Sequence, residues 1–379
     1  FQNQEYLFLG LDGNGLNIYD KKNDKAQFFD ETIVKAKYIQ KIIQTKDNNF
    51  WFGTFGNGLI KFDLNRKKTT QYLNVFKDEN SLSFNDVRDI IEDEHQNLWI
   101  ATWGGGLNYL DVTTNKFSRF TIPNNNIISL LKDGKKIWMA TFGGGLSVFD
   151  IETKKVETYS FDEKDSKTIS SNNLFSILKD SKGYLWIGTS GEGINRMNLK
   201  TREIERFEND ENVKYKNITS IEEDDQKNIW FGSKNGIVKY DYSNKTFNTF
   251  TGLSGDFHIN SSFKDDKGFL YFGGINGVLK FDPRKLNNEN LQPKVAIRNF
   301  KLFNKEVTVG DQKIIQKNIE SVTDITLKHF QNVITFEFSA LKFPFSQNCE
   351  YAIKMENFEQ DWRTIGKDRT ATFTNLSPG

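Results

Sequence analysis

Three histidines are the residues of this chain whose type most readily does chemistry. His95, His258 and His329 stand far apart in the sequence. A histidine serves as a catalytic base when it activates a serine or cysteine, and none of the three stands in such a pattern. We therefore expect surface or turn positions: His95 in a polar turn, His258 just before a strand and His329 at a strand end.

Two glycine triplets, at 104–106 and 143–145, could form a phosphate-binding loop. Neither is followed by Lys-Ser/Thr or by a helix, so hairpins are the better interpretation. The DGNG segment at 12–15 lacks the further carboxylates of a calcium loop. One cysteine, Cys349, allows no internal disulfide and no cysteine-rich zinc site. We predict no catalytic residue, no cofactor and no metal site.

A repeat covers most of the chain. The segment LWIATWGGGL at 98–107 recurs as IWMATFGGGL at 137–146 and as LWIGTSGEGI at 185–194. Looser copies complete seven aromatic anchors with a mean spacing of about 44 residues, and such periods are typical of propeller blades. We expect the anchors to be buried between blades: Phe8, Trp51, Trp99, Trp138, Trp186, Trp230 and Tyr271.

Each repeat predicts four strands, named A to D from the propeller axis outward. An apolar A strand ends in aspartate, the B strand carries the anchor, a glycine-rich hairpin leads to C, and an alternating segment supplies D. The aspartate recurs once per repeat, whereas a protein needs a pair of catalytic carboxylates at only one place. We therefore predict that these aspartates cap turns: Asp93, Asp133, Asp180, Asp224 and Asp265.

Counting strands exposes a gap. The first repeat starts at its B strand and the seventh has no clear D strand after Asp282. We expect one segment upstream of Phe1 to supply both and close the ring. The sequence thus predicts an all-β protein: a seven-bladed β-propeller with four-stranded blades at 1–282, a linker at 283–293 and a C-terminally incomplete immunoglobulin-like β-sandwich at 294–379. Its expected strands are 295–303, 325–327, 333–338, 351–355 and 370–374.

One propeller face carries the candidate binding residues. Because the strands alternate in direction, the B–C hairpins and the D–A loops emerge on the same face. Aromatic faces suit the C–H surfaces of sugar rings, and arginine or asparagine can bond hydroxyl or acidic groups. Packing between blades or domains is the alternative role for these side chains. The candidates are Phe55, Trp103 and Phe142 in hairpins, with Arg88, Phe175 and Asn260 near the starts of A strands.

Charge and hydropathy exclude several partners. The 51 Lys and Arg nearly balance the 50 Asp and Glu, which argues against nucleic-acid binding and against a polybasic membrane patch. No apolar run is long enough to cross a bilayer, and the first residues lack the zones of a signal peptide. We expect membrane attachment, where it exists, to lie in a transmembrane helix outside this sequence.

Two segments resemble a known family. The form DSKGYLWIGTSGEGI at 180–194 is similar to the regulator-propeller repeats in sensor regions of hybrid two-component systems. The tail, with FEFSAL at 336–341, YAIKMENF at 351–358 and TATFTNLSPG at 370–379, resembles the tyrosine-motif immunoglobulin-like domain that follows the propellers there. Phe373 stands where that family often has tyrosine.

The resemblance implies a function for the whole protein. It implies a periplasmic, ligand-sensing part of an inner-membrane hybrid histidine kinase and response regulator, with a second propeller upstream. It also implies a homodimer through the sandwich, oligosaccharide ligands and control of polysaccharide-utilisation genes. The sensor region itself would not be an enzyme. Two alternatives stay open at this point: a propeller-type polysaccharide lyase or other carbohydrate-active enzyme, and a protein-interaction scaffold.

Overall fold

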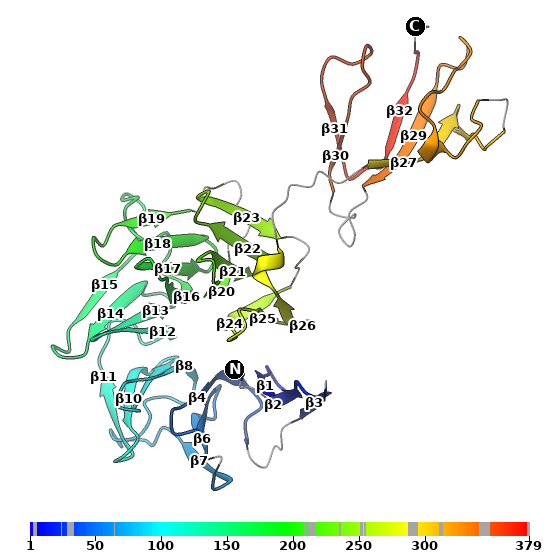
Figure 1. Ribbon diagram of the computed structural model, residues 1–379. Helices are drawn as coiled ribbons and strands as arrows, with labels where there is room; N and C mark the ends of the chain where they lie inside the picture. Colours follow the sequence, from blue (N-terminus) through cyan, green and yellow to red (C-terminus); the bar gives the residue numbers. More distant parts are fainter. Residues whose placement is uncertain are drawn as a thin grey trace. The chain divides into compact units, whose positions relative to one another are not determined.

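The chain forms two compact units, Phe1–Asn287 and Asn288–Gly379, in the computed structural model (Figure 1). Nearly all regular structure is β, and the helical segments among the described residues are the short 3-10 turns η1 (Pro283–Lys285) and η3 (Ile319–Ser321). The structure describes residues 1–2, 6–23, 25–28, 34–63, 65–207, 210, 217–234, 236–250, 253, 255–286, 295–310, 314–340 and 349–376.

Seven antiparallel sheets follow one another along the first unit, and each one is built from consecutive strands. The first three are β1 (Tyr6–Gly10), β2 (Leu16–Asp20), β3 (Lys25–Phe28); β4 (Ile39–Gln44), β5 (Phe50–Thr54), β6 (Leu59–Asp63), β7 (Lys68–Tyr72); and β8 (Val87–Glu92), β9 (Leu98–Thr102), β10 (Gly106–Asp111), β11 (Lys116–Phe120).

The remaining four sheets repeat this order, with the A strand first where one is present. They are β12 (Ile127–Asp133), β13 (Lys136–Thr141), β14 (Leu146–Asp150), β15 (Val156–Tyr159); β16 (Leu174–Lys179), β17 (Tyr184–Thr189), β18 (Ile194–Asn198), β19 (Ile204–Arg206); β20 (Ile218–Glu223), β21 (Ile229–Ser233), β22 (Gly236–Asp241), β23 (Thr246–Phe250); and β24 (Phe257–Lys264), β25 (Leu270–Gly274), β26 (Gly277–Phe281).

The aromatic anchors are buried, as the repeat predicts. Trp186 and Trp230 are 0% exposed, and Phe8 at 7% is the most exposed of the seven. Six apolar clusters each combine the anchor of one sheet with inner strands of the next; Trp138 of β13, for example, packs with Leu174 and Ile187 of the following sheet. Because both faces of each inner strand are covered, B strands such as β9 are buried at every position.

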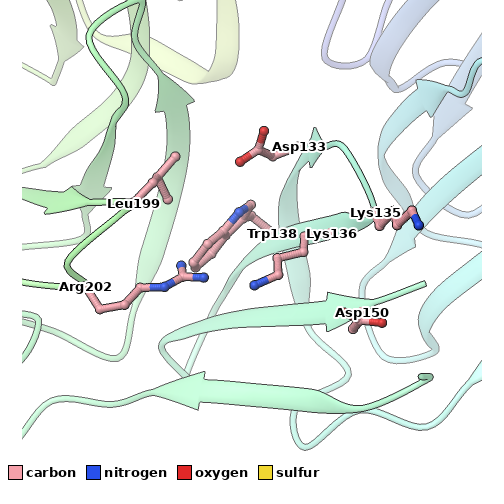
Figure 2. Close-up of a pocket in the computed structure, with 7 residues that line it drawn as sticks. All are labelled: Asp133, Lys135, Lys136, Trp138, Asp150, Leu199 and Arg202. Carbon is pink, nitrogen blue, oxygen red and sulfur yellow. The ribbon is translucent and has the colours of Figure 1, made fainter. Parts of the chain in front are cut away.

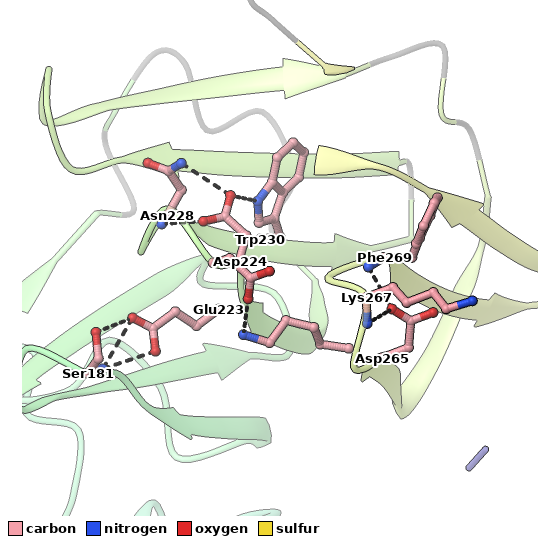
Figure 3. A network of polar contacts seen from close by, with 10 residues as sticks. Ser181, Glu223, Asp224, Asn228, Trp230, Asp265, Lys267 and Phe269 are labelled. Carbon is pink, nitrogen blue, oxygen red and sulfur yellow. Dashed lines mark hydrogen bonds and ion pairs between the residues drawn. The ribbon is translucent and has the colours of Figure 1, made fainter. Parts of the chain in front are cut away.

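Four of the five predicted aspartates cap A–B turns, namely Asp93, Asp180, Asp224 and Asp265. Asp133 was predicted wrongly: its turn is one residue shorter, and its carboxylate pairs with Lys179 instead. Asp224 Oδ1 accepts from Asn228 N at 2.8 Å, and Asp224 Oδ2 accepts from the Trp230 indole Nε1 at 2.7 Å (Figure 3). Asp180 makes the same indole bond to Trp186 at 2.7 Å. One carboxylate therefore closes the turn and fixes the anchor ring of its own sheet.

The turns also link neighbouring sheets. Glu223, at the end of β20, accepts from the backbone N of Ser181 at 3.0 Å and from its hydroxyl at 2.5 Å (Figure 3). Glu92 at the end of β8 accepts in the same way from Lys46 N at 3.1 Å. These bonds join the end of an A strand to the A–B turn of the preceding sheet.

The described residues give three strands to the first sheet and three to the seventh, against four in each of the others. Beside β1, Phe1 exchanges backbone hydrogen bonds with Phe8 at 2.7 and 3.2 Å, where other sheets have the end of an A strand. Burial lowers the pKa of Lys21, and the charges of Asp265 and Asp266 oppose this, so the A–B turn of the seventh sheet lies within electrostatic range of the first sheet. The domain limits remain predictions, and so does the source of the A strand of the first sheet and of the D strand of the seventh.

The second unit contains two sheets with one core. The four-stranded sheet has the order β28 (Lys305–Glu306), β27 (Val295–Leu302), β29 (Ile334–Ala340), β32 (Thr370–Phe373), and the two-stranded sheet pairs β30 (Tyr351–Ile353) with β31 (Arg363–Gly366). Phe338 and Tyr351 meet across them with ring centres 5.3 Å apart. The immunoglobulin-like identity of this unit remains a prediction.

Three local expectations were wrong: a strand at 325–327, the place of His258 before a strand, and the place of His329 at a strand end, since His329 lies in a turn. Residues 325–327 form no strand, although Ile325 and Leu327 pack on the core of the second unit. The sequence pattern also missed β31, whose polar composition gives no alternating signal. His258 lies inside β24 rather than before it, because the register of that strand is interrupted between Phe257 and Ser262.

The capping role of Asp224 can be tested by Asp224→Ala. This substitution leaves the Trp230 and Asn228 donors buried without an acceptor, which costs about 3 kcal/mol. We expect the apparent melting temperature of the chain to fall by about 6 °C or more. Asp241→Ala is the matched control, because Asp241 caps a solvent-exposed C–D turn through Ser243 N. Thermal melting of the two variants, followed by circular dichroism, measures the difference. Equal falls in melting temperature for Asp224→Ala and Asp241→Ala would contradict the capping role of Asp224.

Candidate functional site

The predicted hairpin aromatics are held by a repeated backbone contact. Trp103 N donates to Asp86 O at 2.9 Å, and Phe142 N donates to Asn126 O at 2.9 Å. Each bond ties a B–C hairpin to the loop just before the A strand of the same sheet. The two kinds of loop therefore share a face, as the alternation of strand direction predicts.

In each of these B–C hairpins, the buried hydroxyl of the threonine that ends the B strand holds the turn by a hydrogen bond. Thr102 Oγ1 donates to Gly106 O at 2.9 Å, and Thr141 Oγ1 donates to Gly145 O at 2.7 Å. Gly106 has a φ of 75°, in the left-handed region that glycine adopts without strain. The residue after the threonine is consequently presented at a defined place in each hairpin.

Five of the six predicted residues lie in one continuous group. Trp103 and Phe142 have ring centres 5.5 Å apart, and Phe142 and Phe175 stack at 6.2 Å. The Arg88 guanidinium lies 5.2 Å from the Trp103 ring centre and 5.8 Å from that of Phe55. We name this group the aromatic arc: Phe55, Arg88, Trp103, Phe142 and Phe175.

Bulges in the A strands place two members of the arc. The register of β8 shifts between Val87 and Asp89, and that of β16 shifts between Leu174 and Ser176. Arg88 and Phe175 are the residues left over by these shifts. A bulge bends the strand and re-aims its extra side chain, which explains how an inner strand delivers residues to the loop face.

Arg88 forms a largely buried ion pair with Asp86. Its Nη2 lies 2.8 Å from Asp86 Oδ2, and the two side chains are 23% and 5% exposed. Arg88 Nη1 also donates to Gln40 Oε1 of the preceding sheet at 3.3 Å. Burial raises the pKa of the Asp86 carboxyl above its usual range, and the Arg88 charge and hydrogen bond offset part of that increase.

A cavity of about 380 Å³ opens beside this pair. Phe55 and Trp103 line it, together with Asp86, Phe84 and two asparagines that sequence analysis did not single out. Phe55 is 50% and Phe84 46% exposed, so aromatic surface faces solvent here. An acidic residue directly before β8 and two positions before Arg88 is the sequence signal that could have identified Asp86.

Asn260 lies apart from the aromatic arc. Its side-chain Nδ2 donates to Ile128 O at 2.9 Å, which links the seventh sheet to the fourth. Its φ of 53° belongs to the irregular part of β24. The placement of Asn260 therefore indicates a structural bond across the inner strands.

The histidines show no catalytic arrangement. His95 N donates to Asp93 Oδ1 at 2.9 Å in an A–B turn, and the rings of His95, His258 and His329 are exposed. Among the residues that the structure describes, no three His, Cys, Asp or Glu side chains form a metal-binding group. Within the same described part, no helix is long and apolar enough to cross a membrane.

The fold and repeat define the class of protein. A family model described as two component regulator propeller matches residues 81–104, 168–191 and 212–235. Each match spans an A strand and the anchor strand that follows it. The chain therefore carries repeats that match the regulator-propeller model, and the resemblance that the sequence showed for its repeats is confirmed.

Particular relatives follow from wider comparison. The chain is 28% identical over 373 residues to Histidine kinase P4 of Formosa agariphila, covering 94% of this chain and 27% of that protein. It thus spans about a quarter of the curated relative. The extracellular domain of the putative hybrid two component system BT4673 from B. thetaiotaomicron matches with a TM-score of 0.62 at 19% identity, covering 100% of this chain and 52% of that one.

A further solved structure shares the fold. PorZ, a bacterial surface component of the type-IX secretion system of Porphyromonas gingivalis, matches with a TM-score of 0.56 at 16% identity, over 99% of this chain and 58% of that one. A common fold therefore serves proteins with different tasks, and the side chains of the site must decide the function.

The Asp86–Arg88 pair predicts a pH-dependent stability. The pKa of Asp86 is higher in the folded than in the unfolded chain, so its contribution to stability is greatest below the ordinary carboxyl pKa and falls as pH rises through the folded value. Arg88→Gln removes the offsetting charge and raises that pKa further. We expect the variant to melt about 5 °C below the parent at pH 8.

At pH 4.5 we expect a smaller difference, because the raised pKa makes protonation of Asp86 easier and a protonated Asp86 needs no cation. Arg66→Gln is the control, since the Arg66 side chain is 82% exposed and pairs loosely with Asp63. Differential scanning fluorimetry at both pH values measures the effect. A deficit of the same size at pH 4.5 and pH 8 would show that Arg88 acts through packing alone.

Proposed function

We propose that this chain is an extracytoplasmic, non-catalytic ligand-sensing region of a two-component histidine kinase, and that the aromatic arc binds glycan-derived oligosaccharides. The regulator-propeller repeats and the relation to Histidine kinase P4 support the sensor class. In this proposal the kinase, the receiver and the membrane anchor belong to the rest of a hybrid protein in the inner membrane. The signal controls genes for polysaccharide use.

The observation that carries the sugar assignment is the polar pair set among aromatic faces. The rings of Phe55 and Trp103 both lie close to the Arg88 guanidinium and supply apolar surface beside it. A sugar ring has C–H faces that stack on such surface and hydroxyl edges that both donate and accept hydrogen bonds. The cavity volume of about 380 Å³ lies within the range of small-ligand sites.

Asp86 and Arg88 also retain unused hydrogen-bonding capacity. Asp86 Oδ1 and Arg88 Nε are buried and have no hydrogen-bond partner among the described residues. An unfilled buried acceptor beside an unfilled donor is unfavourable. A hydroxyl group that enters with a small shift of the pair satisfies both, and such an exchange favours the liganded arrangement.

Signalling requires a second arrangement of the protein. A ligand shifts an equilibrium only as far as its affinities for the two states differ. The aromatic arc spans the second to fifth sheets, so a ligand held there links separate sheets of the propeller. We propose that the resulting change passes to the second unit and to a homodimer formed through it, with an upstream propeller of the same protein as a further contact.

Calorimetric titration of the 379-residue chain with a panel of oligosaccharides tests the proposal. Chromatography of the mixture after each titration shows whether the saccharide has changed. We expect saturable binding and an unchanged saccharide. Shortened or unsaturated products would indicate a carbohydrate-active enzyme instead. Absence of both binding and product across the panel would favour an interaction scaffold.

Trp103→Ala and Phe142→Ala should each weaken saccharide binding by about tenfold or more, because each removes an aromatic face of the arc. We expect their melting temperatures to fall by less than about 3 °C, since Trp103 and Phe142 lie at the loop face outside the apolar clusters. Trp362→Ala is a matched control, because Trp362 is 69% exposed in the second unit. A large fall in melting temperature with unchanged affinity would mean that the arc serves packing.

A further inference from the structure

A second cavity, of about 440 Å³, lies between the fourth and fifth sheets. It is formed at the A–B and C–D turns, and strand alternation puts these turns on the face opposite the aromatic arc. Figure 2 shows its lining side chains. They are Asp133, Lys135, Lys136, Trp138, Asp150, Leu199 and Arg202.

Two cations converge in this cavity, and neither forms a close ion pair among the described residues. The Arg202 guanidinium lies 4.8 Å from the Trp138 ring centre, and the Lys136 ammonium points toward it from the neighbouring sheet (Figure 2). Like charges that approach each other are unfavourable unless an anion lies between them.

The carboxylates that line the same cavity are already engaged. Asp133 Oδ1 lies 2.6 Å from Lys179 Nζ of the next sheet. Asp150 Oδ1 accepts from Thr153 N at 2.8 Å and caps its own turn, and this hydrogen bond is the main cause of its lowered pKa. The third cation, Lys135, pairs with Glu152 at 2.5 Å. Lys136 lies opposite Asp150 in the pairing of β13 with β14, and its charge is a minor cause of the lowered pKa of Asp150. The Lys136 charge is therefore partly compensated, and the Arg202 charge is not.

Two buried donors at this place also lack acceptors. Trp138 Nε1 and Arg202 Nη1 are buried and have no hydrogen-bond partner among the described residues, and the Trp138 side chain is 1% exposed. In the fifth and sixth sheets the turn aspartate accepts the indole N–H, whereas the indole of Trp99 in the third sheet, like that of Trp138, has no acceptor among the described residues. The turn before Trp138 is one residue shorter, and Asp133 makes no such bond.

We propose that this cavity binds an oxyanion, a carboxylate or sulfate group, between Arg202 and Lys136. The unpaired groups are donors and cations only, and a planar guanidinium beside an ammonium is suited to an anionic group with two or more oxygens. A small swing of the Arg202 side chain toward Lys136 brings Nη1 to the anion and opens the indole N–H. The bound oxyanion is either a free inorganic anion or the acidic group of a sugar.

The 379-residue chain is titrated with glucuronate, with inorganic sulfate and with glucose. Calorimetry measures binding, and NMR records the tryptophan indole N–H signals. We expect saturable binding of glucuronate, sulfate or both, a shift of the Trp138 indole signal, and no effect of glucose. The tighter of the two anions identifies the source of the oxyanion. No binding of either anion, or binding without a shift of the Trp138 signal, overturns the proposal.

Arg202→Gln and Lys136→Gln should each weaken anion binding about tenfold or more. Lys154→Gln is the matched control, because Lys154 has the same turn position one sheet earlier, with a φ of 59° against 67° for Arg202, and lies over Phe120 and Phe149. Equal affinities of the Arg202 and Lys154 variants would overturn the site. Trp103→Ala should leave anion binding unchanged, which separates this proposal from that for the aromatic arc.

Discussion

The packing of one sheet's anchor ring against the next sheet is the interaction on which the first unit depends. A four-stranded sheet has two apolar faces, and it cannot bury both by itself. Trp186, for example, is fully buried against Ile218 and Phe231 of the following sheet. Burying an aromatic side chain of this size contributes roughly 4 to 6 kcal/mol before conformational entropy is subtracted. The turn aspartates matter because they orient these rings.

Once the sheets are held through their centres, their two edges can differ in chemistry. At one edge the hairpin residues after Thr102 and Thr141 are aromatic and flank the Arg88–Asp86 pair. At the other edge short turns bring cations over the anchor rings, as Arg202 does over Trp138. The same inter-sheet core thus supports an apolar site with a central ion pair on one face and a cationic site on the other.

The sequence predicted the strand order and the anchors because both repeat seven times, and repetition makes a weak local signal strong. It also predicted the aromatic arc, since strand direction alone places the hairpins of Phe55, Trp103 and Phe142 on one face. Asn260 and the Trp138 cavity were beyond such reasoning. The first depends on an irregular strand, the second on a turn one residue shorter than its neighbours, and both are departures from the repeat.

The bulges in the A strands have a consequence for how such a protein changes over time. Five A strands shift register by one residue at the same place, and the residues left over are Gln40, Arg88, Ile128, Phe175 and Thr219. They range from a cation to an aromatic ring, while the backbone around them is alike. Selection can therefore exchange these side chains one at a time, and new ligand preferences can arise without refolding the scaffold.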